Sequence, residues 1–465
     1  MPQSQLCRGG GHFMEDMTAG SPLALILRFS LPLLLGNLLQ QAYHLADAAI
    51  VGRTLGAAAL AAVGSTSSVQ FLVTGFCQSL CLGFAIPVGQ RFGAGDMRAM
   101  HRFEAAGTFL TVLSAFFLTL GTVFSCRQIL AALQVPGEIF LPAWQYLSVI
   151  FLAIPFTLFY NWFASVMRAV GDSRTPFLYL TAASLLNVLL DCLFIMVFRW
   201  GVPGAAAATA LSQAASAFLC LRALRHRFPL LAISPQEWSF RADESRRLLA
   251  MGIPMGLQWS VIAVGSMVMQ GANNSLGTVC VAAYTAASRL KQFALCPFDA
   301  IATAVSAFVA QNYGASRMER IREGLRRATL AAVLYGFCAG VLLLVFARPL
   351  NRIFLAGTQG SEMELAVLCL RRLGCGLWLL GITNGCRAGL QGTGFAGRAM
   401  GTSLVSMAAR ILVCLCFVGT FGFGAITWAD QAAWLAGAAV SLPVLRHALQ
   451  EAGRRLEADA AEKGD

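Results

Sequence analysis

The sequence has few charged residues: Asp, Glu, Lys and Arg make up only 12% of its 465 positions. A soluble protein carries about a quarter of its residues as charges. This shortage excludes a soluble enzyme, a disordered chain and a large domain outside a membrane. Apolar residues reach 57% and the mean hydropathy is +0.67. The composition therefore predicts an all-α, polytopic membrane protein.

Motifs of enzymes and of metal sites are also missing. The chain has no Gly-x-Ser-x-Gly, no His-Glu-x-x-His and no Walker-type phosphate loop, and of its five histidines only His44 lies well inside an apolar run. The 14 cysteines are scattered without metal-type spacing, so they act as small apolar residues. We therefore expect no metal, no cofactor and no catalytic residues. The start of the chain shows no removable signal peptide.

The apolar runs predict twelve membrane-spanning helices, each long enough for a hydrocarbon core about 30 Å thick. The first six cover about residues 24–51, 58–90, 103–125, 140–167, 177–198 and 203–221. The second six cover about residues 248–270, 279–311, 328–347, 365–386, 399–420 and 424–445.

The net charge of +12 is an orientation signal, because short cytoplasmic loops retain Lys and Arg. With the N-terminus inside, most of the 34 basic residues lie in cytoplasmic loops and tails. The outer loops hold only Arg53, Arg127, Arg199, Arg348 and Arg352. We therefore expect the protein in the inner or plasma membrane of the cell, with both termini in the cytoplasm. We expect the lipid bilayer as a partner, and we expect no binding of nucleic acid.

An internal repeat relates the two halves at a nearly constant offset of 220 to 222 residues. The matches pair Pro32 with Pro254, Ala61-Ala62 with Ala282-Ala283, Gln90 with Gln311, Gly93-Ala94 with Gly314-Ala315, Gly171 with Gly392, and Gly204-Ala205 with Gly424-Ala425. Six helices per repeat give two parallel lobes related by a pseudo-two-fold axis along the membrane normal, which is a transporter architecture. The predicted divisions are a cytoplasmic tail (1–23), an N-lobe (24–221), a cytoplasmic linker (222–247), a C-lobe (248–446) and a second tail (447–465).

Two acids lie inside spans of the first lobe. Asp47 shares a helical face with Gln40 and Tyr43, and Asp191 follows Asn187 by one helical turn. An acid at the bilayer centre costs about 2.5 to 3.5 kcal/mol on insertion scales. Burial and a second carboxylate both disfavour the charged form, so such a pair can bind a proton. The alternative is that each acid is only a hydrogen-bonded packing residue.

Several segments resemble the multidrug and toxic compound extrusion (MATE) family. They are residues 51–60, 90–96, 168–176, 187–191 and 311–315, together with Pro32, Gln40, Tyr43 and Asp47. The resemblance covers about residues 24–445. It implies a twelve-helix, two-lobe antiporter that exports small organic, often cationic compounds in exchange for H⁺ or Na⁺, alternating between outward- and inward-facing states.

Within that family the chain looks like the DinF-like branch. The resemblance implies an ion-coupling site of Asp47, Asn187, Asp191 and Thr209, and a substrate cavity that also includes Gln40, Tyr43 and Asn161. It also implies a bend of the first helix at Pro32, a residue type that removes a helical hydrogen bond. A first-lobe Na⁺ site remains open, because these side chains offer hard oxygen ligands. We expect a monomer.

The second lobe lacks the acids that the NorM-like branch places in its seventh and tenth helices. Its remaining charges leave alternatives open. Asp299 either lines a cleft or pairs with a base, Arg410 is favoured as an interhelical brace over a substrate contact, and Asp430 is expected to face water. Whether Lys291 lines a cavity is open. The rivals to an antiporter are a lipid-linked precursor flippase, a membrane-embedded enzyme and a channel.

Overall fold

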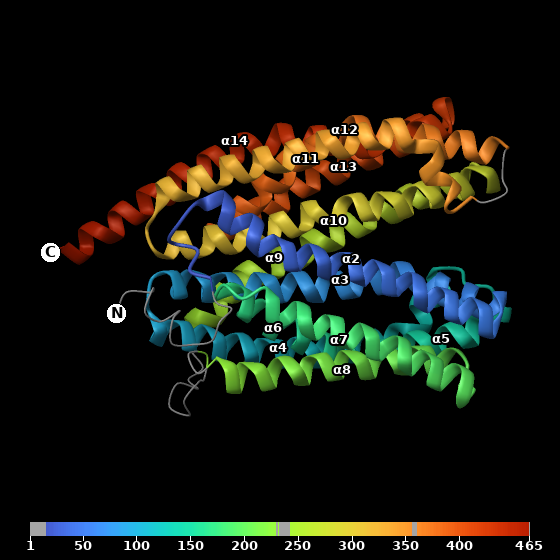
Figure 1. Ribbon diagram of the computed structural model, residues 1–465, viewed down its shortest axis with the longest axis horizontal. Helices are drawn as coiled ribbons and strands as arrows, with labels where there is room; N and C mark the ends of the chain where they lie inside the picture. Colours follow the sequence, from blue (N-terminus) through green and yellow to red (C-terminus); the bar gives the residue numbers. More distant parts are fainter. Residues whose placement is uncertain (1–14, 229–230, 232–241, 356–359, 465) are drawn as a thin grey trace. The chain divides into compact units, whose positions relative to one another are not determined.

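The fold is all-α in the computed structural model, which describes residues 15–228, 231, 242–355 and 360–464 and contains no β-strand within them (Figure 1). The helices of the first half are α2 (Pro22–Leu55), α3 (Ala57–Gly93), α4 (Met97–Ala132), α5 (Gly137–Leu152), α6 (Ile154–Ala169), α7 (Arg174–Asp191), the π-helical η1 (Cys192–Val197) and α8 (Val202–Arg227). Those of the second half are α9 (Ala242–Asn274), α10 (Thr278–Gly314), α11 (Met318–Arg352), α12 (Ser361–Gly392), α13 (Ala396–Phe421) and α14 (Phe423–Gly464).

Among the described residues, eleven helices are long and apolar enough to span a membrane, or twelve if the bent pair of α5 and α6 counts as one span. This confirms the predicted number. The predicted span 140–167 is the bent pair, with an angle of 42° between its halves. Pro155 lies in the first turn of α6, where its missing N–H costs nothing, and it cannot continue the hydrogen bonding of α5. The proline therefore divides this crossing into two helices.

The outer face of α11 shows why these helices suit a bilayer. Leu330, Leu334, Phe337, Val341 and Val345 recur every three or four residues, and each is more than 40% exposed. In water such a stripe would be a large apolar patch, whereas lipid chains cover it at no cost. The protein is therefore a multi-pass membrane protein.

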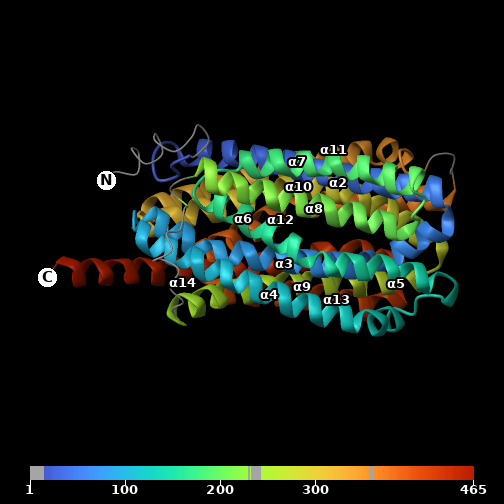
Figure 2. The same ribbon diagram turned by 90° about the horizontal axis from the view of Figure 1, so that it is seen from below.

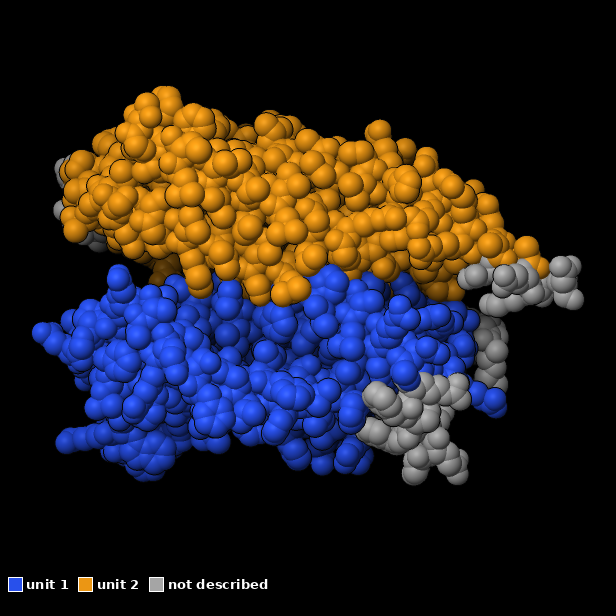
Figure 3. Space-filling view, turned by 180° about the vertical axis from the view of Figure 1, so that it is seen from behind, with its two compact units in different colours: residues 1–16, 35–256 blue, residues 17–34, 257–465 orange. Residues whose placement is uncertain are grey.

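The chain forms two compact units, coloured separately in Figure 3. Unit 1 contains residues 1–16 and 35–256, and unit 2 contains residues 17–34 and 257–465. Residues 24–34, assigned to the N-lobe from the sequence, thus group with unit 2, and residues 248–256 group with unit 1. The boundary inside α2 falls three residues after Pro32, and α2 is one helix throughout.

Three segments that were expected outside the spans are described only in part. Residues 1–14 of the first tail and residues 229–230 and 232–241 of the linker lie outside the described residues. The second tail, 447–465, continues α14 as far as Gly464. We predicted the end of this span from the point where apolar residues become rare. The helix continues beyond that point because the following residues are good helix formers.

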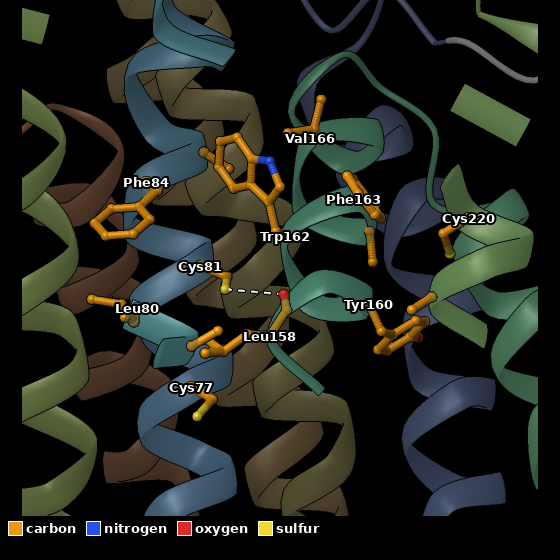
Figure 4. Close-up of a cluster of buried hydrophobic side chains, with 14 of the residues drawn as sticks. Cys77, Leu80, Cys81, Phe84, Leu158, Tyr160, Trp162, Phe163, Val166 and Cys220 are labelled. Atoms are coloured by element: carbon orange, nitrogen blue, oxygen red, sulfur yellow. Dashed lines mark hydrogen bonds between the residues drawn. The ribbon is translucent and has the colours of Figure 1, made fainter. Parts of the chain in front are cut away.

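The core of unit 1 holds α6 against α3 and α4 (Figures 2 and 4). The thiol of Cys81 donates to the carbonyl oxygen of Leu158 at 3.5 Å, and the indole N–H of Trp162 donates to Thr108 Oγ1 at 3.0 Å. Trp162 covers Gly107, where an added Cβ would lie 2.3 Å from the Trp162 ring. Only glycine allows this close approach, so the position of α6 is fixed sterically.

In unit 2, α12 is the central helix, with contacts to α10, α11, α13 and α14. Its closest neighbour is α11, because Gly340 and Gly374 face one another. A Cβ added at Gly340 would lie 2.4 Å from the carbonyl oxygen of Gly374. Small residues bring helices close in membranes, where the hydrophobic effect cannot drive them together.

Candidate functional site

The centre of the candidate site is the pair Asp47 and Asp191, which we call the acid pair. Asp47 lies on the part of α2 that belongs to unit 1, and Asp191 is the last residue of α7. The two carboxyl groups lie close enough to interact electrostatically. The sequence suggested each acid by itself, and the structure brings them together.

The closeness of the two carboxyl groups has a chemical consequence. Two ionised carboxylates only accept hydrogen bonds and repel each other, so a proton taken up by one of them would relieve the repulsion. Within the described residues, no N–H or O–H group donates to Asp47 Oδ1 or to either oxygen of Asp191, and Asp191 is fully buried. Buried oxygens without donors are costly. A bound proton or another cation would remove that cost.

Asn187 and Thr209 form a polar support beside the acid pair. Asn187 lies one turn before Asp191 on α7 and is 2% exposed. Its Nδ2 donates to Thr209 Oγ1 of α8 at 3.4 Å, and Thr209 Oγ1 in turn donates to the carbonyl oxygen of Ala205 at 3.2 Å. This orientation leaves Asn187 Oδ1 buried and without a donor in the described structure. The support therefore adds one more free oxygen to those of the acid pair.

The helix that carries Asp191 changes its geometry at that residue. Asp191 ends the α-helical part of α7, and residues Cys192–Val197 continue as a π-helix. A π-helical turn is wider than an α-helical turn and is frequent at functional sites. The chain then turns at Arg199 and Gly201, both with positive φ, before α8 begins. The sequence pattern did not predict this change, because a π-helical turn contains only about one residue more than an α-helical turn.

Two tyrosines surround the acid pair. Tyr43, one turn before Asp47, is close enough to both carboxyl groups to interact with them electrostatically. Tyr146 on α5 is also close enough to both carboxyl groups to interact with them, is 2% exposed, and lies near the side chain of Gln70 of α3. Tyr146 and Gln70 were missed from the sequence. Both are polar residues within apolar runs, which is the only signal that pointed to them.

The other predicted cavity residues are less closely connected. Asn161 is buried on α6, but its Nδ2 donates to the carbonyl oxygen of Thr157, one turn earlier. Gln40 is partly exposed on α2. In the part of the chain that the structure describes, no hydrogen bond joins either amide to the acid pair. The described residues also contain no group of three or more His, Cys, Asp and Glu side chains suited to a metal.

Several ionic residues of unit 2 form ion pairs. Asp430 forms ion pairs with Lys291 and with Arg410, the latter at 3.0 Å, and it is 6% exposed. The expectation that Asp430 faces water was wrong, because α10 and α13 each direct a base at it. Arg410 is a brace between helices, as favoured, and also approaches Ser266 at 3.5 Å. Asp299 faces Arg387 of α12.

Comparison with known proteins identifies the family. The MatE family model matches residues 32–193 and 254–416, two segments that begin at Pro32 and Pro254 as the internal repeat does. The probable multidrug resistance protein YpnP of Bacillus subtilis (strain 168) is 34% identical over 345 residues, which cover 73% of this chain and 76% of the relative.

Solved structures agree on the fold. The crystal structure of MATE in the bent conformation is 22% identical, with a TM-score of 0.88 over 98% of this chain and 99% of that one. The crystal structure of MATE in the straight conformation is 21% identical, with a TM-score of 0.83 over 95% and 98%. The chain therefore belongs to the MatE family, and it is a membrane transporter of the multidrug efflux class rather than an enzyme.

Proposed function

We propose that the protein is a secondary active antiporter that exports small organic compounds, often cationic, in exchange for H⁺ or Na⁺. The observation that carries this proposal is the acid pair: the carboxyl groups of Asp47 on α2 and Asp191 on α7 lie close together, and three of their oxygens are buried without a donor in the described structure. A structural role alone would be better filled by apolar side chains, because buried ionisable groups rarely add stability.

The proton is the coupling ion that the acid pair fits best. One shared proton satisfies both carboxyl groups, and its loss leaves two like charges side by side in a region of low dielectric. That repulsion favours a different arrangement of α2 and α7. A membrane potential supplies about 2.3 kcal/mol per elementary charge per 100 mV, which is enough to bias such a rearrangement.

Sodium is the second coupling ion to be tested. Asp47, Asp191, the free Oδ1 of Asn187 and Thr209 Oγ1 supply the carboxylate, amide and hydroxyl oxygens that hard cations take as ligands. Both ions would compete for the same oxygens. Imposing the two gradients separately therefore decides between them.

The remaining residues have supporting roles in this proposal. Tyr43 lines the substrate cavity next to the acid pair, and Gln40 and Asn161 line it further away. Pro32 weakens α2 within the helix, because it cannot donate to the carbonyl oxygen four residues earlier. Alternating access is supported by a multidrug resistance MATE family transporter with this fold that was solved in an outward-facing conformation. The working unit is a monomer.

The location follows from the distribution of basic residues. Short loops rich in Lys and Arg stay in the cytoplasm. Arg98 and Arg102 at the start of α4 and Arg322, Arg326 and Arg327 at the start of α11 mark one side of the membrane. We place this side and both termini in the cytoplasm, and the protein in the cell membrane.

Transport by the purified full-length chain in liposomes tests the proposal. We expect ethidium to move against an imposed pH gradient, an imposed Na⁺ gradient, or both. Asp47→Asn and Asp191→Asn should each reduce the rate to that of empty liposomes, because an amide cannot take up and release a proton near neutral pH. Each variant should still insert and remain monodisperse.

Asp243→Asn is the matched control, since it removes an exposed acid from the first turn of α9 in the same unit. Its transport rate should equal that of the unchanged protein. Gradient-driven ethidium transport at full rate by both acid-pair variants would refute the coupling role of Asp47 and Asp191.

A further inference from the structure

The C-terminal end of α8 carries basic side chains that take no part in the proposed coupling site. Arg222, Arg225, His226 and Arg227 are four of the last six residues of this helix, and all four are exposed. The helix itself contains neither Asp nor Glu. Within the part of the chain that the structure describes, none of the four forms an ion pair. The positive charge at this end of α8 is therefore not balanced by a described ion pair.

Two of these arginines continue the lipid-facing side of the helix. Leu211 and Phe218 are 50% and 64% exposed, and in a membrane protein such apolar side chains face lipid. Arg222 follows Phe218 by four residues and Arg225 follows it by seven, so both lie on the helical face of Phe218. Arg227 follows Phe218 by nine residues and lies on the opposite face. The Arg222 and Arg225 guanidinium groups therefore lie where the lipid-facing surface reaches the head groups.

Two general effects account for only part of this pattern. Cations in the last turn of a helix interact favourably with its dipole, which suits Arg225 and Arg227, but Arg222 precedes that turn. The orientation signal of Lys and Arg depends on how many bases a loop contains and not on the helical face that they occupy. Neither effect explains why Arg222 lies on the lipid-facing side, so this position points to a partner in the bilayer.

The acids around α8 do not supply the missing negative charge. The helix packs against α5, α6 and α7. Glu138 lies in the first turn of α5 and Asp191 at the end of α7, and the direction of these helices places both at the other end of the bundle. Asp172 lies close to Cys220 of α8, but it is fully buried and its Oδ1 accepts from the backbone N–H groups at the start of α7. The exposed arginines are therefore available to an anion from outside the protein.

We propose that Arg222 and Arg225 bind the phosphate group of an anionic phospholipid whose acyl chain lies against Phe218. A guanidinium group donates two parallel hydrogen bonds to a phosphate group, and two such groups four or fewer residues apart on a helix can reach the same head group. A phospholipid matches both parts of this surface, the apolar face and the charged end. A soluble phosphate would match the charge alone. The inference goes beyond the proposed function and does not depend on ion coupling.

Native mass spectrometry of the purified full-length chain in a neutral detergent tests this inference. Dioleoyl phosphatidylglycerol is the probe, and dioleoyl phosphatidylcholine, whose head group has no net charge, is its counterpart. The measured quantity is the Kd of the first lipid bound. We expect phosphatidylglycerol to bind at least tenfold more tightly, which corresponds to about 1.4 kcal/mol. Equal affinity for the two lipids would overturn the proposal.

Arg225→Gln and Arg227→Gln form a matched pair, because they remove the same charge from the same turn of α8 but from opposite faces. Arg222→Gln and Arg225→Gln should each weaken phosphatidylglycerol binding about fivefold, the usual contribution of one base at an anionic surface. Arg227→Gln should change it by less than about twofold. An equal loss for Arg225→Gln and Arg227→Gln would show that only the total charge of this end matters, and the assignment of a site would be wrong.

Two further measurements complete the experiment. Soluble glycerol 3-phosphate tests the other source of a phosphate group: in large excess it should leave bound phosphatidylglycerol in place, whereas displacement at a similar affinity means that the head group alone is bound, which overturns the assignment to a lipid. Asp47→Asn should bind phosphatidylglycerol as the unchanged protein does, so failure of the coupling proposal is seen separately, in transport.

Discussion

Thr209 provides a sharp test of how the acid pair is supported. Its hydroxyl accepts the hydrogen bond from Asn187 Nδ2 at 3.4 Å, and Thr209→Val removes that acceptor while keeping the shape of the side chain. The protein should still fold, since the hydroxyl contributes no other contact to a neighbouring helix than this one in the described structure. Only the orientation of the Asn187 amide should change.

The size of the effect follows from the geometry. Hydrogen bonds between membrane helices contribute about 0.6 kcal/mol on average, and an amide left unsatisfied costs about 1 to 3 kcal/mol. The 3.4 Å distance is long, which favours the lower part of this range. A change of about 0.6 to 1.4 kcal/mol corresponds to a shift of about three- to tenfold in the proton concentration for half-maximal transport. The maximal rate should change little.

The assay is the initial rate of ethidium transport in liposomes at a series of external pH values, for the unchanged protein, Thr209→Val, Asn187→Ala and the double variant. If Thr209 acts through Asn187, the double variant behaves as Asn187→Ala does, because the second change removes nothing further. Additive effects of the two changes would refute this reasoning and would give Thr209 a direct role at the ion.

Two further predictions concern the packing of the units. Gly107→Val should lower the midpoint of thermal unfolding by several degrees and reduce the yield of folded protein, because its side chain meets the Trp162 ring, whereas Gly121→Val on the same helix has open space and should leave the midpoint within about a degree; equal behaviour of the two would contradict the packing argument. Asn312→Ala should speed proteolytic cleavage of the segment before α2, because Asn312 Nδ2 donates to the carbonyl oxygen of Met17 at 3.0 Å and its Oδ1 accepts from Arg320 at 3.1 Å. An unchanged cleavage rate, measured by mass spectrometry of the N-terminal fragment, would show that these bonds do not hold the segment.

The spans could be predicted well from the sequence, because hydropathy reports directly on the cost of placing a segment in lipid. The split of residues 140–167 at Pro155 was not predicted, although the proline was visible, since a proline inside a membrane helix bends it in some settings and is tolerated in others. The continuation of α14 past residue 445 was missed because the loss of apolar residues marks the membrane surface and not the helix end.

The candidate site was predictable only residue by residue. Asp47 and Asp191 drew attention because each is an acid in an apolar run, but their closeness depends on how α2 and α7 pack. Tyr146 and Gln70 gave a weaker signal, since burying a single Tyr or Gln at a helix interface costs little free energy. The error over Asp430 has the same origin: Lys291 on α10 is far away in sequence, and Arg410 on α13 meets Asp430 only because α13 packs against α14.

The bend between α5 and α6 divides one membrane crossing into two segments with different contacts. Tyr146 precedes the bend in the chain and lies near the acid pair. Trp162 follows the bend and packs over Gly107. A single straight helix would transmit a displacement of one end to its other end. Because the helix breaks at Ala153, a shift of α5 beside the acid pair need not displace α6, which packs against α3 and α4.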